Sequence, residues 1–315
     1  MKLDQLKNLV AVGRAGSVRQ ASRDLNLSQP AVTKSIKALE AELGCELIHR
    51  LSHSVIPTPS GEALIKRAIT IDAELNNARN EIENIEGVMT GDISVSASPT
   101  VAINLMPTAI LNLKTARPQM TVHIEELVYP HVLPAVRSGE IDVAVCLMPE
   151  QPIADDLKID VLVEDVLTPA VRSDHPLVTT PGLRLDDLLE EEWLVFGRRG
   201  ESRDIYEQTF RLNGMEPPKS TIECTSFTCA LALVEKSDYI VLVPKQIFAD
   251  RPQAWPITPL DLQTPMQPWT IAAITRSNVV MSAASRVFLE ELRKAVSVKN
   301  VAALSNIMMP DADRI

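Results

Sequence analysis

Residues 17–44 read SVRQASRDLNLSQPAVTKSIKALEAELG, and this stretch predicts two helices separated by a short break. Ser17 is suited to begin the first helix, because its side-chain oxygen can accept a hydrogen bond from a backbone N–H in the first turn. The apolar residues on one face of that helix recur at helical spacing; they are Val18, Ala21 and Leu25. Asn26 and Leu27 interrupt the pattern, so the turn is expected there.

The second helix has clear start and stop signals. Ser28 is a second N-cap, and Pro30 falls in the first turn, where a missing N–H has no cost. Gly44 is the residue type that most readily ends a helix in a left-handed conformation. A single apolar stripe is formed by Val32, Ile36, Leu39 and Leu43, so this helix is expected to bury Val32 and Ile36.

The opposite face of this second helix suits a DNA duplex. Its residues near the helix start are Gln29, Ala31, Thr33, Lys34 and Lys37. Gln can pair with an adenine edge, and Ala or a Thr methyl can contact a thymine methyl. Lysines and a helix N-terminus suit phosphates. The alternative is an ordinary bundle helix with a solvated polar face, and periodicity alone leaves both interpretations open.

The amino-acid sequence of residues 15–50 is more specific than helical periodicity; it reads AGSVRQASRDLNLSQPAVTKSIKALEAELGCELIHR. It resembles the N-terminal signature of LysR-type transcriptional regulators. In that family an alanine-rich helix, a Ser-Gln-Pro-Ala segment and an Ile-x-x-Leu-Glu run form a winged helix-turn-helix. Ile48 stands where the family usually has Phe, and Pro57 where it usually has Leu. The departures therefore concern the wing rather than the recognition helix.

This resemblance implies a sequence-specific regulator that binds double-stranded DNA. In the two helices the candidate DNA-contacting residues are Ser17, Ser28, Gln29, Pro30, Ala31, Thr33, Lys34 and Lys37. The following segment, CELIHRLSHSVIPTPSGE, has the short alternation of a two-stranded wing, and its candidates are Arg50, Ser52 and His53. For Ser52 and His53, an exposed hairpin without a role is an equal alternative.

The composition of the chain is compatible with this interpretation when the distribution of charge along the sequence is considered. A chain of 315 residues with 45% hydrophobic and 23% charged residues is expected to form two or three folded domains. Its net charge of −10 at first argues against a nucleic-acid partner. However, residues 1–60 carry a net +3 and the remainder −13. A basic N-terminal module on an acidic body keeps DNA binding local to one end.

The N-terminus reads as a charged amphipathic helix rather than a signal peptide, and no apolar run is long enough to span a bilayer. We therefore expect a cytoplasmic protein with no membrane partner. The cysteines Cys45, Cys146, Cys224 and Cys229 lack zinc or C-x-x-C spacing, so no metal or cofactor is expected. Reduced thiols are the default, with Cys224 and Cys229 as an alternative redox pair.

A long helix is expected after Thr58, which can cap it, with Pro59 at its first position. Its apolar residues alternate in steps of four and three, the spacing of a coiled-coil seam, and they are Leu64, Ala68, Ile71, Leu75, Ala78, Ile82 and Ile85. Such a stripe needs a partner, either the chain's own body or a second copy. LysR-type proteins pair these helices, so the resemblance implies a homodimer and commonly a homotetramer built as a dimer of dimers.

The sequence changes character after a hinge at residues 87–91. Apolar strands are expected at residues 93–97, 121–127, 141–147, 161–168, 193–196, 239–243 and 269–275. Helices are expected between them, at 100–117, 130–138, 203–212, 227–236 and 281–295. Strands that alternate with helices predict a parallel sheet covered on both faces.

The predicted fold is multidomain: an all-α winged helix-turn-helix with a long linker helix, then a two-lobed α/β effector domain. The family's effector domain is similar to periplasmic solute-binding proteins. The expected domains are 1–58 for DNA binding, 59–90 for the linker, 91–300 for the effector domain and 301–315 for a tail. Lobe I takes about 91–163 and 269–300, and lobe II about 164–268, with crossovers near 164–169 and 265–271. Ser237 and Asp238 replace the family's usual Gly-Gly pair.

In α/β sheets, ligands bind beyond the carboxyl ends of strands, at helix N-termini. In lobe I this rule selects Ser98, Pro99, Thr100, Val128, Tyr129, His131 and Leu147. In lobe II it selects Phe196, Gly197, Arg198, Thr225, Ser226 and Phe227. Hydroxyls, a cation and aromatic walls would suit a small carboxylate with an apolar or aromatic body. The alternatives are plain helix caps for Ser98 and Thr100 and a solvated surface position for Arg198.

The leading hypothesis is a transcription regulator whose promoter contacts respond to a small effector, with RNA polymerase as a candidate partner. A redox-sensing regulator that uses Cys224 and Cys229 is a variant of it. A solute-binding module without DNA function would have a secretion signal and no basic winged domain, the reverse of this chain. An enzyme is disfavoured, because the chain lacks a G-x-S-x-G elbow, a P-loop, a dinucleotide fingerprint and an H-E-x-x-H motif.

Overall fold

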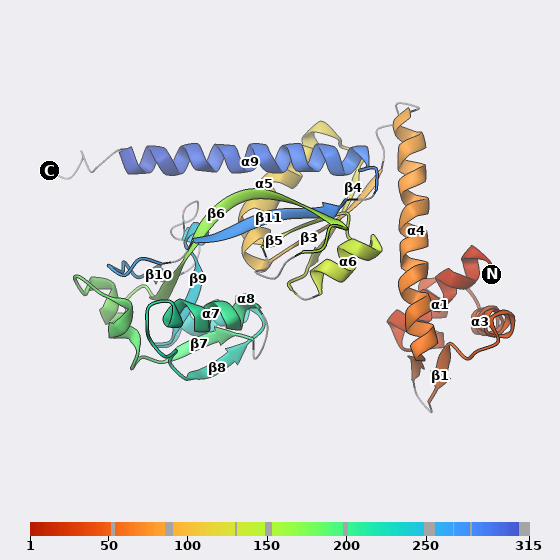
Figure 1. Ribbon diagram of the computed structural model, residues 1–315, viewed down its shortest axis with the longest axis horizontal. Coiled ribbons are helices and arrows are strands. Elements are labelled where there is room, and N and C mark those ends of the chain that lie inside the picture. The colour runs from red at the N-terminus through yellow and green to blue at the C-terminus, as the bar shows by residue number, and fades with distance from the viewer. Residues whose placement is uncertain are drawn as a thin grey trace. The chain divides into compact units, whose positions relative to one another are not determined.

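The computed structural model describes residues 1–51, 54–85, 91–129, 131–148, 153–197, 201–248, 256–266, 268–277 and 279–308. The chain divides into two compact units (Figure 1). The first contains residues 1–88 with 137–141, and the second contains 89–136 with 142–315. The hinge expected at 87–91 lies outside the described residues, apart from Gly91.

The N-terminal unit has the predicted winged helix-turn-helix order. Its elements are α1 (Leu3–Ala15), α2 (Val18–Asp24), α3 (Gln29–Leu43), β1 (Ile48–Arg50), β2 (Val55–Pro57) and α4 (Pro59–Ile85). The strands β1 and β2 pair antiparallel, so the wing is confirmed. Leu9 of α1, Ala21 of α2 and Ile36 of α3 are fully buried in one cluster.

Local capping explains these boundaries. The Ser17 hydroxyl accepts from the Gln20 N–H at 3.4 Å, and the Ser28 hydroxyl accepts from the Ala31 N–H at 3.3 Å. Asn26 has a φ of 54°, a left-handed conformation that Asn tolerates better than most residues, and it makes the turn between α2 and α3. Gly44 ends α3 with a φ of 70°. The buried part of the apolar stripe of α3 ends at Leu39, and Leu43 is 43% exposed.

Helix α4 begins inside the first unit and leaves its core after about three turns. Ala68 is buried in the core and Leu64 packs against it. Both were expected in an intermolecular seam, but the structure assigns them to the chain's own core. Ile71 and Leu75 are each 38% exposed, Ile82 is 61% exposed, and Ala78 is also exposed. The side chain of Ile85 lies outside the described set.

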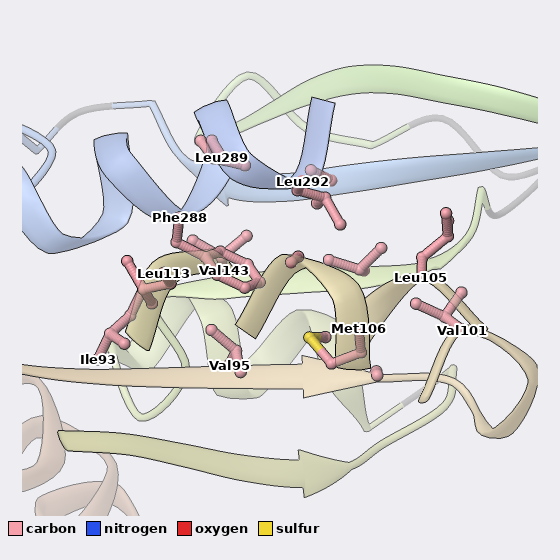
Figure 2. Packing of buried hydrophobic residues seen from close by; sticks show 14 of the residues in the cluster. Ile93, Val95, Val101, Leu105, Met106, Leu113, Val143, Phe288, Leu289 and Leu292 are labelled. Atoms are coloured by element: carbon pink, nitrogen blue, oxygen red, sulfur yellow. The ribbon is translucent and has the colours of Figure 1, made fainter. Parts of the chain in front are cut away.

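Lobe I of the second unit is a sheet with two helices packed on one face. Strands β3 (Asp92–Ala97), β4 (Thr121–Glu126) and β5 (Val143–Leu147) run parallel, with β3 in the middle. Helices α5 (Pro99–Ala116) and α9 (Ala283–Met308) pack on each other. Figure 2 shows Phe288, Leu289 and Leu292 of α9 above Leu113 and Leu105 of α5, with Ile93 and Val95 of β3 below. The short α6 (Val132–Ser138) follows β4.

A long strand, β6 (Leu157–Arg172), joins the two lobes. Its first part pairs antiparallel with β11 (Pro268–Arg276), from Leu157 opposite Arg276 to Val166 opposite Pro268. Its last part pairs antiparallel with β9 (Ile240–Pro244) and β10 (Ile257–Pro259). The partner of β6 changes from β11 to β9 between Val166 and Leu167, within the range expected for the first crossover. The sequence predicted a parallel sheet, but the observed sheet is mixed. The strands that cross between the lobes, β6 and β11, pair antiparallel with their neighbours.

Lobe II has helices on both faces of its strands. Alternate residues of β7 (Trp193–Phe196) show this: Trp193 and Val195 face the cluster that contains α7 (Glu201–Arg211), whereas Leu194 faces α8 (Phe227–Glu235). Strand β9 alternates in the same way, which is why both strands are almost uninterrupted apolar runs.

Several elements were not predicted. They are β8 (Ser220–Cys224), β10, and the 3-10 helices η1 (Pro176–Thr179), η2 (Leu185–Leu188) and η3 (Lys245–Phe248). Helix α9 also continues to Met308, beyond its expected end and into the expected tail.

Candidate functional site

The N-terminal unit presents the start of α3 to solvent. Val32, Ile36 and Leu39 are fully buried, so the helix is fixed by one face. The expected contact residues Ser28, Gln29, Pro30, Ala31, Lys34 and Lys37 are exposed, and Ser17 and Thr33 are half-buried. The buried Asn8 side chain of α1 donates to the Ser35 hydroxyl at 2.8 Å, which fixes the rotation of α3. This surface can place an amide, a methyl group and two ammonium groups in a groove.

The wing, formed by β1 and β2, follows α3 in the chain and carries the remaining candidate contacts. Arg50 ends β1 and is exposed. Ser52 and His53 lie outside the described residues. An exposed guanidinium on a hairpin suits contact with a phosphate or with the minor groove.

The second unit contains a cavity of about 190 Å³ between its two lobes. Ten of the expected ligand residues line it: Ser98, Pro99, Thr100, Val128, Tyr129, Leu147, Phe196, Gly197, Thr225 and Phe227. His131 is exposed and does not line it, and Arg198 lies outside the described residues. The expected cation at this site is therefore not part of the described lining.

Ser98 is the most informative residue in this cavity. It stands at the N-cap of α5 but makes no side-chain capping bond, so the alternative of a plain cap does not hold. Ser98 as a whole is 5% exposed, and its hydroxyl oxygen is buried without a hydrogen-bond partner among the described residues. A buried hydroxyl without a partner is unfavourable, which indicates a position for a ligand or an ordered water.

The lobe II wall is aromatic. The rings of Phe196 and Phe227 stack with centroids 5.5 Å apart and planes 18° apart. Ser226 was expected to contact a ligand, but it does not line the cavity. Its hydroxyl instead accepts from the Cys229 N–H and so caps α8.

Sequence reasoning missed nearly half of the lining. The missed residues are Cys146, Leu167, Leu194, Val195, Ser202, Ile205, Tyr206, Leu242 and Pro244. Ser202 could have been found, because it lies at a helix N-terminus after a strand. The apolar residues lie within strands or in α7, and their sequence does not reveal which face meets the cavity.

The helix starts give this cavity its electrostatic character. Residues at the N-termini of α5, α7 and α8 line it, and each such end carries a partial positive charge. No acidic or basic side chain occurs among the described lining residues, whose polar groups are hydroxyls and one thiol. The site can therefore stabilise a single negative charge and bury an apolar body.

Comparison with known proteins agrees with both halves of this description. The family model described as the LysR substrate binding domain matches residues 86–297. The model for bacterial regulatory helix-turn-helix proteins of the lysR family matches residues 3–62. The chain belongs to the LysR family of transcriptional regulators. It is thus a DNA-binding transcription regulator with an effector-binding domain.

Individual LysR-type relatives match over nearly the whole chain. The uncharacterized HTH-type transcriptional regulator YdcI of Escherichia coli (strain K12) is 25% identical over 296 residues, 94% of this chain and 96% of that protein. The HTH-type transcriptional regulator GbpR of Azospirillum brasilense is 26% identical over 308 residues, 96% and 89% of the two chains.

Solved LysR family structures share the architecture. The crystal structure of CbnR has a TM-score of 0.72 at 23% identity and covers 94% of this chain and 99% of that chain. Full-length CbnR complexed with its target DNA has a TM-score of 0.70 at 25% identity and covers 94% and 100%. Within the described part of this chain, no helix combines the length and hydropathy needed to cross a bilayer.

Proposed function

We propose that the start of α3 reads DNA bases and that the wing anchors the duplex backbone. The main observation that supports this proposal is that Gln29, Ala31 and Lys34 are exposed on a helix whose opposite face is fully buried. Gln29 supplies the base-reading amide, whereas Lys34, Lys37 and Arg50 supply phosphate contacts. The solved DNA complex of CbnR, a LysR family structure of the same architecture, supports DNA binding by this unit.

Substitutions in α3 should separate base reading from phosphate binding. On a site selected by the wild-type protein from random duplexes, Gln29→Ala should lose about 1–3 kcal/mol of discrimination against altered bases. Lys34→Ala should weaken binding to all sequences and lower the salt dependence by about one counterion per copy. Lys236→Ala removes an equal charge from the second unit and should change neither quantity. Unchanged binding by a Gln29→Ala, Lys34→Ala double variant would contradict the assignment.

The effector proposed for the cavity is a small monoanion with an apolar or aromatic body. The main observation that supports it is the Ser98 hydroxyl at the start of α5, which is buried without a hydrogen-bond partner among the described residues. A volume of about 190 Å³ has room for one ring with a carboxylate, because a cavity of about 150 Å³ already holds benzene. The absence of an acidic side chain among the described lining residues disfavours ammonium compounds.

Three matched probes test this proposal. Benzoate should raise the melting temperature of the full chain with concentration, whereas benzamide and benzylamine should not. Ser98→Ala should weaken benzoate binding about tenfold, because a hydrogen bond to a charged group is lost. Ser96→Ala is the control: the Ser96 hydroxyl is also buried without a described partner, but it does not line the cavity. Equal shifts with all three probes would contradict the anion preference.

Dimerisation through the exposed part of α4 is also proposed. Ile71, Leu75 and Ile82 form an apolar stripe that the N-terminal unit leaves exposed. Ile82→Glu should shift the sedimentation of the full chain toward monomer, whereas Arg79→Glu on the same helix should not. Two-fold pairing would let one effector-dependent change reach two recognition helices, provided that the effector binds one arrangement of the copies more tightly. The proposed location is the cytoplasm, where promoter DNA is found.

A further inference from the structure

Two cysteines meet at the junction of β8 and α8. Cys224 is the last residue of β8, and Cys229 lies in the first turn of α8. The Cys224 Sγ donates to the Ser226 carbonyl at 3.3 Å, and the Cys229 N–H donates to the Ser226 hydroxyl at 3.3 Å. One capping residue therefore holds both cysteines within the same turn of chain.

The two thiols also contact each other. A hydrogen bond between their side chains is the largest cause that raises the pKa of the Cys229 thiol. The neighbouring Cys224 side chain therefore favours the protonated form of Cys229. Cys229 is exposed and Cys224 is half-buried, so small molecules can reach the pair.

We propose that Cys224 and Cys229 are a reversible dithiol–disulfide site that exchanges with low-molecular-weight disulfides, and that its closure reshapes the lobe II wall of the cavity. This inference does not depend on the nature of the effector.

The exchange proceeds in two displacements. The Cys224 thiolate attacks one sulfur of the small disulfide, so that a mixed disulfide forms and one small thiolate leaves and takes up the proton lost by Cys224. The Cys229 thiolate then attacks the Cys224 sulfur, which forms the internal disulfide and releases the second small thiol. In total, two protein thiols are oxidised and one small disulfide is reduced to two thiols.

The site is continuous with the cavity. Thr225 and Phe227 lie between the two cysteines and both line the cavity. Phe227 stacks on Phe196, and the Gly197 N–H donates to the Cys224 carbonyl at 3.0 Å. Closing the disulfide breaks the bond between the Cys224 thiol and the Ser226 carbonyl. The turn that presents Thr225 and Phe227 must then adjust.

Peptide mass measurements test the chemistry directly. Trypsin should release residues 220–236, which contain both Cys224 and Cys229 and neither of the other cysteines. The full chain is equilibrated in mixtures of reduced and oxidised glutathione and then alkylated. We expect this peptide to become resistant to alkylation and two hydrogens lighter, fully reversed by dithiothreitol, at ratios where exposed Cys45 remains alkylated. Equal protection of Cys45, or lasting glutathione adducts on Cys224, would overturn the site.

Hydrogen–deuterium exchange tests the coupling to the cavity. Oxidation should change exchange in residues 193–197 and 225–231, and a Cys224→Ser, Cys229→Ser double variant should show no change in the same mixtures. A change confined to residues 220–224, or one that persists in the double variant, would overturn the coupling. Failure of benzoate to bind would overturn the effector proposal but leave both of these measurements intact.

Discussion

Replacing Gly61 with alanine is expected to unfold the N-terminal unit far below the wild-type melting temperature and to abolish DNA binding. An alanine Cβ at this position would lie 1.9 Å from the Leu47 carbonyl oxygen and 2.9 Å from its carbon. Both atoms belong to backbone, so no side chain can turn away. The overlap should destabilise the unit by about 3 kcal/mol or more.

The backbone of Leu47 is held on both sides, which is why it cannot yield. Its N–H donates to the Glu40 carboxylate at 2.9 Å, and its carbonyl accepts from the Thr58 N–H at 3.0 Å. The side chain of Leu47 is buried in the core of the unit. Moving this carbonyl would both disturb the Thr58 cap of α4 and displace the wing.

Calorimetry of the full chain checks this prediction. For a small domain, 1 kcal/mol lowers the melting temperature by about 4–8 °C, so the shift for Gly61→Ala should exceed 10 °C or so. Gly44→Ala is the matched control: its φ of 70° strains an alanine, but no atom lies within 4 Å of the added Cβ. That variant should lose about 1–2 kcal/mol. Equal losses would mean that backbone overlap at Gly61 is not the cause.

The sequence predicted those parts of the fold that local chemistry decides. Ser17, Ser28 and Thr58 cap their helices as expected, because a cap needs only its own first turn. Leu43 and Ala68 show where this reasoning stops. Both continue an apolar stripe, but one is exposed and the other is buried in the chain's own core. Periodicity identifies a face and does not reveal what covers it.

The cavity was half predictable for a related reason. The rule about strand ends located Ser98, Thr100 and Phe196, since these positions follow from strand boundaries alone. Leu167 and Leu242 lie within β6 and β9, and their place in the cavity depends on how the strands pair across the two lobes. Strand β8 was missed because it is a short edge strand with polar residues, which lacks the apolar run of a buried one.

Replacing Asp165 with asparagine is expected to stabilise the second unit at neutral pH. Asp165 lies on β6 just before the strand passes into lobe II, and it is 7% exposed. Its Oδ1 accepts from the Val166 N–H at 2.7 Å, whereas its Oδ2 is buried without a partner among the described residues. Burial raises the pKa of Asp165 to about 6, against the lowering effects of the Val166 and Gln246 N–H groups and of Lys245.

The pH dependence follows from which state binds more protons. The pKa of this carboxyl is about 3.8 when unfolded and about 6 when folded. Between these two pKa values the folded state binds the proton more tightly than the unfolded state does. The stability of the folded state therefore decreases as pH rises from 4 to 6. The full difference corresponds to about 3 kcal/mol above pH 6 and about half of that at pH 5. Asparagine keeps the Oδ1 acceptor and removes the charge.

Urea unfolding at pH 5 and pH 8 tests this expectation. The advantage of Asp165→Asn over the wild type should grow by about 1.5 kcal/mol between the two pH values. Asp174→Asn is the control, because Asp174 is exposed and its hydrogen bond with Arg172 lowers its pKa. Its folded and unfolded pKa values both lie below 5, so its effect should be the same at both pH values. An equally constant advantage for Asp165→Asn would show that removal of a buried charge is not its source.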